Sequence, residues 1–202
     1  NVINGTCIVN GTMYNVASGR TLVDGTGYDI NLTPTLYAMY YSDGNMVFQR
    51  GRKSDSGKVL TDIYVDFENA QYLTSNTVPW HAHRAKLKNI SFRNEVVPKS
   101  MDNWFANCRN LTTNISTLTN LNMNEVLSMS NVYNNCRNLT GSPICGDKVT
   151  NMSGAYYYCN KLTGNPVCSN KITDMSYAYY YCRGLTGKVV CRGIDVSSYQ
   201  SD

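Results

Sequence analysis

The sequence predicts an α/β or mainly β fold, a solenoid of 23-residue repeats preceded by a small β-hairpin cap region. Three observations predict it. Two series of cysteines recur every 23 residues, a methionine stands seven residues before a cysteine in each unit, and Asn-Gly pairs punctuate the first residues. A unit of this length cannot bury its apolar face alone, so it must stack on its neighbours.

Residues 1–34 are predicted to form a small β-hairpin unit. Their segment "NVINGTCIVNGTMYNV" places two Asn-Gly pairs between short apolar alternations, the strongest short-range hairpin signal. The segment "YYSDGNMVF" repeats the signal within residues 35–100, which are predicted to hold the N-terminal cap and the leading strands of the solenoid. The chain begins at Asn1 without a positively charged leader, so we expect a removed leader or a fragment.

Residues 101–191 are predicted to be the solenoid. Its units read "CRNLTGSPICGDKVTNMSGAYYY", "CNKLTGNPVCSNKITDMSYAYYY" and "CRGLTGKVVC", after the more divergent "MDNWFANCRNLTTNIS". The period lies within the leucine-rich-repeat range, and Leu139, Leu162 and Leu185 are expected to begin a short strand. The residues expected in the core are Val149, Met152, Ala155 and Tyr156, followed by Ile172, Met175, Ala178 and Tyr179.

The eight cysteines are predicted to be structural. Zinc sites need close pairs such as C-x2-C, whereas the spacing here is C-x8-C, so we predict no metal and no cofactor. Both series are expected to form buried columns of thiols. Disulfides, such as Cys136 with Cys145, stay an open alternative in an oxidising setting. His81 and His83 share a face if extended, but they lack further ligands and a nucleophile, so neither metal binding nor catalysis is predicted.

The composition favours a contact surface. Charged residues make up only 16% of the chain, which holds 25 Asn and 16 Tyr, and these two residues supply adaptable hydrogen bonds and stiff contact area. They could instead simply fill turns and strands. The segment "HRAKLK" aligns Arg84, Lys86 and Lys88 if extended, either as the wet face of a strand or as a stripe facing an anionic wall polymer or a nucleic acid.

The predicted binding surface lies beside the buried aromatic position of each repeat. Stacked at the repeat period, its residues would form a column of polar aromatic contacts along one flank, suited to sugar rings or protein loops. The alternative is that they pack between coils. The candidates are Tyr157, Tyr158, Tyr180, Tyr181, Asn134 and Asn135.

The repeat unit also resembles a known family. Its pattern is "AY" or "WF", followed by x2-C-x2-L. In this pattern, residues 101–191 resemble the BspA-like (Treponema-type) leucine-rich repeats of bacterial and phage surface proteins. Residues 35–100 resemble the segment that often precedes such repeats. The second cysteine in three coils and the Asn/Tyr-rich surface depart from the family. The resemblance implies a right-handed solenoid used for adhesion or receptor contact, and rarely for catalysis.

Residues 192–202 break the repeat and are predicted to be a linker or the start of a truncated muramidase-like domain. Their segment "GIDVSSYQ" resembles the opening strand of glycoside hydrolase family 25 muramidases. The resemblance makes Asp195 the counterpart of an active-site aspartate. The family's Asp-x-Glu pair lies downstream of this strand and does not occur after the octamer in this sequence, and glycoside hydrolysis needs further carboxyls, so we predict that this chain is not an enzyme.

Together these observations predict a cell-surface or receptor-binding, structural module of a phage tail or lysin, which targets an associated muramidase domain to peptidoglycan. The expected location is the virion or the cell surface. The expected partners are a bacterial surface glycan or protein receptor, other virion proteins and further copies of the chain. No nucleic acid and no membrane span are expected. The alternative is a secreted bacterial adhesin with leucine-rich repeats and no enzymatic role.

Overall fold

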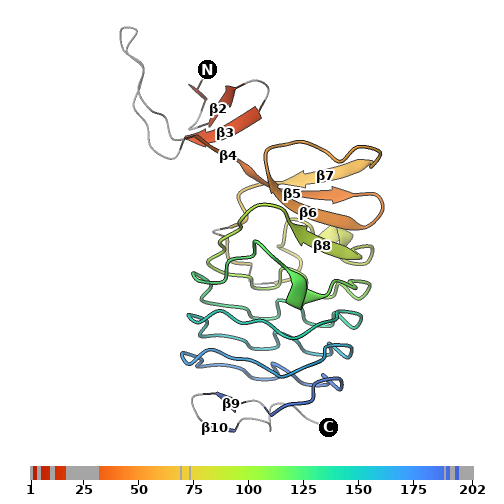
Figure 1. The fold of residues 1–202 in the computed structure, drawn as a ribbon, viewed down its shortest axis with the longest axis vertical. Helices are drawn as coiled ribbons and strands as arrows, with labels where there is room; N and C mark the ends of the chain where they lie inside the picture. Colours follow the sequence, from red (N-terminus) through yellow and green to blue (C-terminus); the bar gives the residue numbers. More distant parts are fainter. Residues whose placement is uncertain are drawn as a thin grey trace.

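The computed structural model has a mainly β architecture (Figure 1). Its described residues contain no α-helix, only short strands and two 3₁₀ turns, η1 (His81–His83) and η2 (Ile115–Thr117). This confirms the mainly β alternative. The structure describes residues 2–3, 6–9, 12–16, 32–68, 70–72, 74–188, 190–191 and 194–195, with side chains in 35–68, 70–72 and 74–188.

The first sheet is antiparallel and has the strand order β1-β2-β3-β4. Ile3 pairs with Thr6, and Val9 pairs with Thr12, so two positions of the sequence separate the paired residues at each strand end. This register confirms the predicted hairpins. The strands are β1 (Val2–Ile3), β2 (Thr6–Val9), β3 (Thr12–Val16) and β4 (Leu32–Pro34).

The second sheet is a four-stranded mixed sheet of order β7-β5-β6-β8. β5 and β6 form the hairpin predicted at Asp-Gly, where Gly44 has a φ of 89° and an added Cβ would meet the Lys86 carbonyl oxygen at 2.7 Å. β8 runs parallel to β6 and forms one edge of the sheet. The strands are β5 (Leu36–Tyr41), β6 (Asn45–Arg50), β7 (Leu60–Tyr64) and β8 (Asn89–Phe92).

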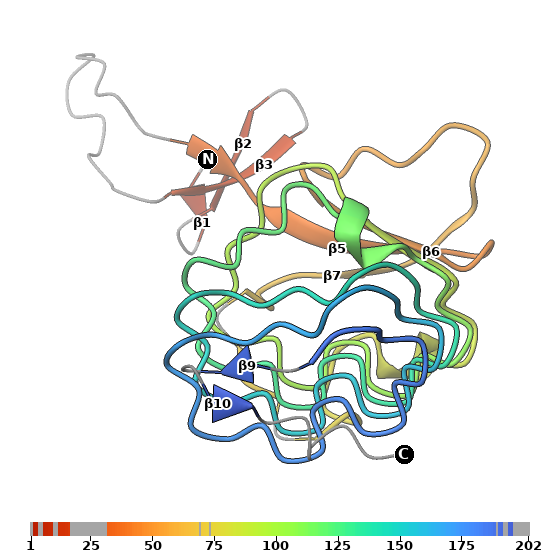
Figure 2. The same cartoon turned by 60° about the horizontal axis from the view of Figure 1, so that its bottom comes forward.

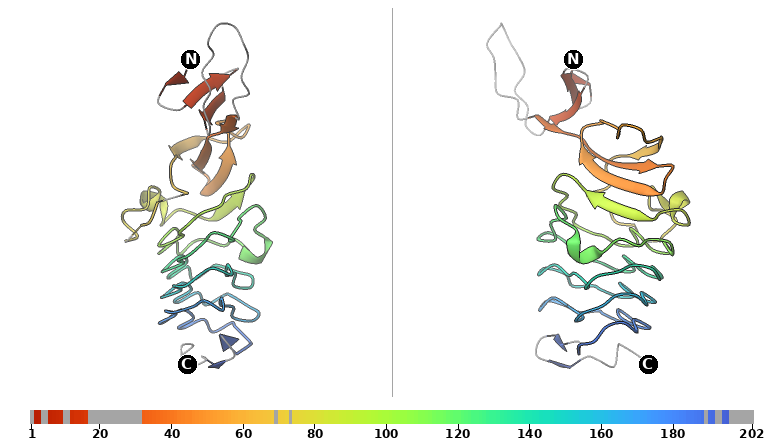
Figure 3. Two further views of the ribbon diagram at one scale, coloured as in Figure 1. Left: turned by 90° about the vertical axis from the view of Figure 1, so that its left-hand side faces the viewer. Right: turned by 45° about the vertical axis from the view of Figure 1, so that its right-hand side comes forward.

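After β8 the chain winds in coils that stack on one another (Figures 1 and 2). Parallel bridges join Ser128 to Asn151 and Asn151 to Asp174, an offset of 23 residues. The expected strands at Leu139, Leu162 and Leu185 do not form. Each of these leucines instead donates its N–H to the carbonyl of a cysteine three residues earlier, which closes a turn. The side views in Figure 3 show the coils extending away from the mixed sheet.

One apolar core runs from the mixed sheet through the coils. All eight residues predicted for the core are buried, with exposed fractions of 7% or less. Along its axis the rings of Phe105, Tyr133, Tyr156 and Tyr179 stack with centroids 5.5, 5.6 and 5.4 Å apart. The same cluster includes Phe48 and Trp80, so the mixed sheet covers one end of the stack.

The first cysteine series forms the predicted column of buried free thiols, at Cys108, Cys136, Cys159 and Cys182. The last three donate to aromatic-residue carbonyls of the preceding coil, for example Cys159 to Tyr133 at 3.0 Å.

The second cysteine series does not form the buried column of thiols that was predicted for it. Its member Cys145 is free but only half-buried, and Cys168, which is also half-buried, is disulfide-bonded. This position lies nearer the surface, so the core does not enclose a thiol there. The suggested bond between Cys136 and Cys145 is absent, because both thiols are free.

Beyond the coils, β9 (Val190–Cys191) and β10 (Ile194–Asp195) form a short antiparallel pair. Ile194 pairs with Cys191, and Asp195 pairs with Val190. The backbone of Asp195 therefore belongs to this pair. The rest of the predicted "GIDVSSYQ" strand lies outside the described residues.

Candidate binding surface

Each of four successive coils contains two residues with left-handed backbone, at φ values from 54° to 66°. Asn, Asp and Gly tolerate this region, whereas a bulky side chain there is uncommon and costs about 1–2 kcal/mol. The first position is occupied by Asn103, Asn131, Gly154 and Tyr177, and the second by Asn107, Asn135, Tyr158 and Tyr181.

The left-handed residues lie on the hydrogen bonds that join the coils. The N–H groups of Asn131 and Gly154 donate to the carbonyls of Ser153 and Ser176, at 2.9 and 2.8 Å. At the second position, the N–H groups of Asn135 and Tyr158 donate to the carbonyls of Tyr157 and Tyr180, at 2.6 and 2.9 Å. Side chains at equivalent positions are therefore held in register, one coil above the next.

This register brings together the four tyrosines that were predicted to form the binding surface. Tyr157 stacks on Tyr180 with centroids 5.4 Å apart, and Tyr158 stacks on Tyr181 at 4.5 Å. The two columns meet edge to face, with centroids 4.6 Å apart in one coil and 4.5 Å in the next. All four side chains are half-buried, so both expectations hold in part: the rings lie on one flank, and they pack between coils.

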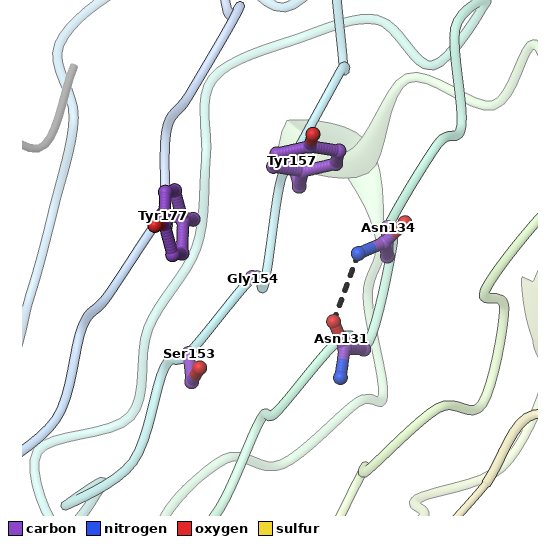
Figure 4. A pocket seen from close by; sticks show the side chains of 6 residues that line it. All are labelled: Asn131, Asn134, Ser153, Gly154, Tyr157 and Tyr177. Carbon is purple, nitrogen blue, oxygen red and sulfur yellow. Dashed lines mark hydrogen bonds between the residues drawn. The ribbon is translucent and has the colours of Figure 1, made fainter. Parts of the chain in front are cut away.

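The two predicted asparagines extend these columns by one coil. The amide of Asn134 donates to Asn131 Oδ1 at 2.8 Å (Figure 4). The amide of Asn135 donates to Asn107 Oδ1 at 3.0 Å, and its own Oδ1 accepts from Arg137 Nε at 2.8 Å. Below the asparagines the columns become aromatic, so the flank changes from amides to phenols along the stack.

A pocket of about 250 Å³ opens beside the Tyr157 column. Gly154 lies in its wall, where an added Cβ would approach Asn131 Oδ1 to 2.3 Å. Tyr177, 61% exposed, stands edge-on to Tyr157 across the pocket (Figure 4). Sequence reasoning missed Tyr177, although its offset of 23 residues from Gly154 could have identified it. The lining is Asn131, Asn134, Ser153, Gly154, Tyr157 and Tyr177.

Two phenols of the tyrosine surface, Tyr157 and Tyr181, have a raised pKa. Desolvation by neighbouring groups raises the pKa of Tyr157. The hydrogen bond with Tyr180 is the main cause that raises the pKa of Tyr181. The phenols therefore act as hydrogen-bond donors and acceptors. The charges of this flank come from Arg137, whose guanidinium lies 5.7 Å from the Tyr158 ring centroid, and from Arg183, 5.3 Å from that of Tyr181.

The basic segment at residues 83–88 does not form the expected stripe. It makes turns in which Arg84 donates its N–H to the His81 carbonyl and Lys86 to that of His83, so its side chains do not alternate as in a strand. Arg84 instead reaches Asn76 Oδ1 through Nη1, at 2.7 Å.

The histidine pair also differs from the extended geometry expected for it. Both residues lie in η1, and they have different partners. His83 Nε2 is 2.8 Å from Asp62 Oδ2 and its ring stacks on Tyr40, whereas His81 Nδ1 lies 3.2 Å from the Val78 carbonyl oxygen. Within the described part of the chain, no three His, Cys, Asp or Glu residues gather in a way that could hold a metal ion.

No helix in the described ranges is long and apolar enough to cross a membrane. Comparisons with protein-family models, with curated proteins and with solved structures find no match for this chain.

Proposed function

We propose that this protein is a binding module for a cell surface, built as a leucine-rich-repeat solenoid of 23-residue units. Three facts support the solenoid: the parallel bridges at an offset of 23 residues, the aromatic stack through the core, and the column of cysteine thiols. The mixed sheet would serve as its N-terminal cap, because it covers the apolar end that a stack of repeats exposes.

The binding role rests on one observation. Three tyrosines, Tyr158, Tyr177 and Tyr181, occupy left-handed positions where earlier coils place Asn or Gly. The earlier coils adopt the same backbone conformation with Asn or Gly, which cost less in this region. Strained residues persist where function retains them, and tyrosine suits recognition because it offers large contact area with few rotatable bonds. We assign the recognition surface to these tyrosines with Tyr157, Tyr180, Asn134 and Asn135.

The proposed ligand is a surface glycan or a protein receptor of a bacterial cell. The flank offers phenol hydroxyls, amides and a pocket of about 250 Å³ whose six lining residues carry no charge. Such sites hold a ligand through a few well-placed polar groups. Further copies of the chain and other virion proteins stay candidates for partners of the remaining surface.

The test is binding of the fluorescently labelled chain to a panel of bacterial cells. The double variant Tyr157→Ala/Tyr180→Ala should lose most of the cell binding and remain folded, because the buried rings of the core are untouched. The control is Val59→Ala/Val65→Ala, which truncates two exposed side chains outside the flank. Equal binding by the tyrosine variant and the control would refute the recognition surface.

We also propose, on the resemblance of "GIDVSSYQ" to family 25 muramidases, that the module serves a peptidoglycan-cleaving domain in a phage tail or lysin. The chain itself is proposed to have no enzymatic activity. The alternative is a secreted adhesin. The reading frame that encodes the chain discriminates between the two: an Asp-x-Glu pair after the octamer supports the lysin, and a cell-wall anchor signal supports the adhesin.

A further inference from the structure

A second pocket, of about 520 Å³, lies near the amide end of the flank. Two arginines line it, Arg84 and Arg109, and no carboxylate does. Arg84 is oriented by Asn76, and Asn110 is fixed by a hydrogen bond of 2.7 Å from its amide to the Ala85 carbonyl oxygen. The pocket is therefore basic, polar and partly preorganised. Its lining is Ser75, Asn76, Arg84, Ala85, Asn107, Arg109 and Asn110.

A chain of side-chain contacts connects this pocket to the tyrosine columns. Asn107 in the pocket accepts from Asn135, which accepts in turn from Arg137. Arg137 lies over Tyr158, which stacks on Tyr181. Arg183 lies over Tyr181 at the far end. We call this series the arginine line, from Arg84 and Arg109 through Arg137 to Arg183. It crosses three coil intervals, about 14 Å at the usual spacing of paired strands.

The four guanidinium groups have no carboxylate partner within the described residues. The ion pairs there involve Lys58, His83, Arg93 and Lys148 instead. Arg109, Arg137 and Arg183 are exposed, and Arg84 is half-buried. A row of unneutralised guanidinium groups attracts carboxylate or phosphate groups, to which the planar fork can donate two parallel hydrogen bonds.

The tyrosine rings of the arginine line argue against single-stranded nucleic acid as the polyanion that binds there. Proteins that hold single-stranded nucleic acid stack its bases on open aromatic faces. Here Tyr158 and Tyr181 stack on each other, and Arg137 and Arg183 lie over these rings. A ligand on this line meets ring edges, hydroxyls and guanidinium groups, which can bind anions and sugar hydroxyls but offer little to a base.

We propose that the arginine line binds an acidic polysaccharide, with one anionic group of the chain seated in the pocket of Arg84 and Arg109. The inference rests on the proposed function and names its ligand class: a glycan polymer with carboxylate or phosphodiester groups at regular intervals. The uncharged pocket beside Tyr177 then lies next to the line and can contact neutral hydroxyls of the same chain.

The experiment measures binding of four polymers to the intact chain by biolayer interferometry at 50 and 200 mM NaCl. The polymers are polygalacturonate, poly(glycerol phosphate), neutral dextran and oligo-dT. At least one of the two acidic polymers should bind. Its affinity should be at least about tenfold lower at 200 mM than at 50 mM NaCl, because each arginine contact releases counterions. Dextran and oligo-dT should bind at least about tenfold more weakly than that polymer at 50 mM NaCl.

The double variant Arg84→Gln/Arg109→Gln should reduce the affinity by about tenfold and flatten the salt dependence. The matched control is Arg52→Gln/Lys53→Gln, which removes the same charge from two exposed residues outside the line. Melting temperatures of both variants are measured first. If Arg84→Gln/Arg109→Gln fails to fold, Arg137→Gln/Arg183→Gln replaces it with the same expected loss.

The outcomes separate the two proposals. A preference for polygalacturonate assigns carboxylate as the recognised group, and a preference for poly(glycerol phosphate) assigns phosphate. Equal loss in the control pair, or oligo-dT binding as tightly as the best acidic glycan, overturns the inference. Binding to cells that is lost in Tyr157→Ala/Tyr180→Ala, with no binding to either acidic polymer, overturns the inference and leaves the proposed function standing.

Discussion

Replacing Tyr177 by Asn should stabilise the protein, although it removes an aromatic side chain. Tyr177 has a φ of 58°, and a non-glycine residue in this region costs about 1–2 kcal/mol, of which Asn relieves a large part. The ring makes only edge contacts, with centroids 6.4 Å from Tyr157 and 5.6 Å from Tyr180, and it is 61% exposed. Each such ring pair contributes about 0.5–1.5 kcal/mol when buried, so these two pairs, on a mostly exposed ring, together contribute about 0.5–1 kcal/mol. The net gain is about 0.5 kcal/mol.

The matched variant is Tyr157→Asn, in the same pocket but without a left-handed backbone. It relieves no strain and loses the stack on Tyr180, 5.4 Å away, so it should destabilise by about 1 kcal/mol or more. The melting temperature, measured by circular dichroism, should rise by about 1–3 °C in Tyr177→Asn and fall by a similar amount in Tyr157→Asn.

Both variants should bind cells less well, because both remove a ring from the proposed surface. The reasoning is refuted if Tyr177→Asn lowers the melting temperature as much as Tyr157→Asn does. The backbone at position 177 would then carry no strain that Asn can relieve. If Tyr177→Asn is more stable but binds cells as well as the unchanged protein, the backbone strain at position 177 is real, but cell binding does not explain why the tyrosine is retained.

Further predictions concern the core. Tyr133→Phe should raise the free energy of unfolding by about 1 kcal/mol, because the buried hydroxyl of Tyr133 has no hydrogen-bond partner. Tyr156→Phe should lower it by about as much, since its hydroxyl bonds both the N–H and the carbonyl of Ile144; equal effects of the two changes in urea titrations would contradict this. Burial raises the pKa of the Cys108 and Cys182 thiols to about 12 from an ordinary 9.0, so the unfolded chain releases these protons first. Stability should therefore be complete below pH 9 and fall by about 1 kcal/mol per pH unit and thiol as the pH rises toward 12; melting temperatures that stay level from pH 8 to pH 10.5 would argue against it. The four buried thiols should resist a thiol-specific disulfide reagent until urea unfolds the chain, and their rapid modification in the native state would show that the column is open.

The period of the sequence predicted the interior well. Apolar residues 23 positions apart must meet when units stack, so Met152 above Met175 and Tyr156 above Tyr179 could be assigned to the core from spacing alone. The hairpins were equally predictable, because Asn-Gly and Asp-Gly favour the backbone of tight turns. In both cases a local pattern and the global packing require the same residues.

The surface was less predictable, because its conformation depends on backbone that the pattern does not reveal. Expecting strands at Leu139 and Leu162 was wrong, since their N–H groups close turns within a coil. The role of Tyr177 was missed because "SYAYYY" gives no sign that its first tyrosine is left-handed. Only the alignment with Asn131 and Gly154, residues that commonly adopt this backbone, could have pointed to it.

That alignment also bears on why the tyrosines are there. The same two backbone positions recur in four coils, and in the first two both are occupied by asparagine. The fold therefore does not require an aromatic residue at either position. Tyrosine appears in the last two coils, on the flank that also carries Arg137 and Arg183. A residue that weakens its own backbone in coils that could use asparagine is best explained by a contact outside the chain. The arginines beside it indicate the charge of that contact.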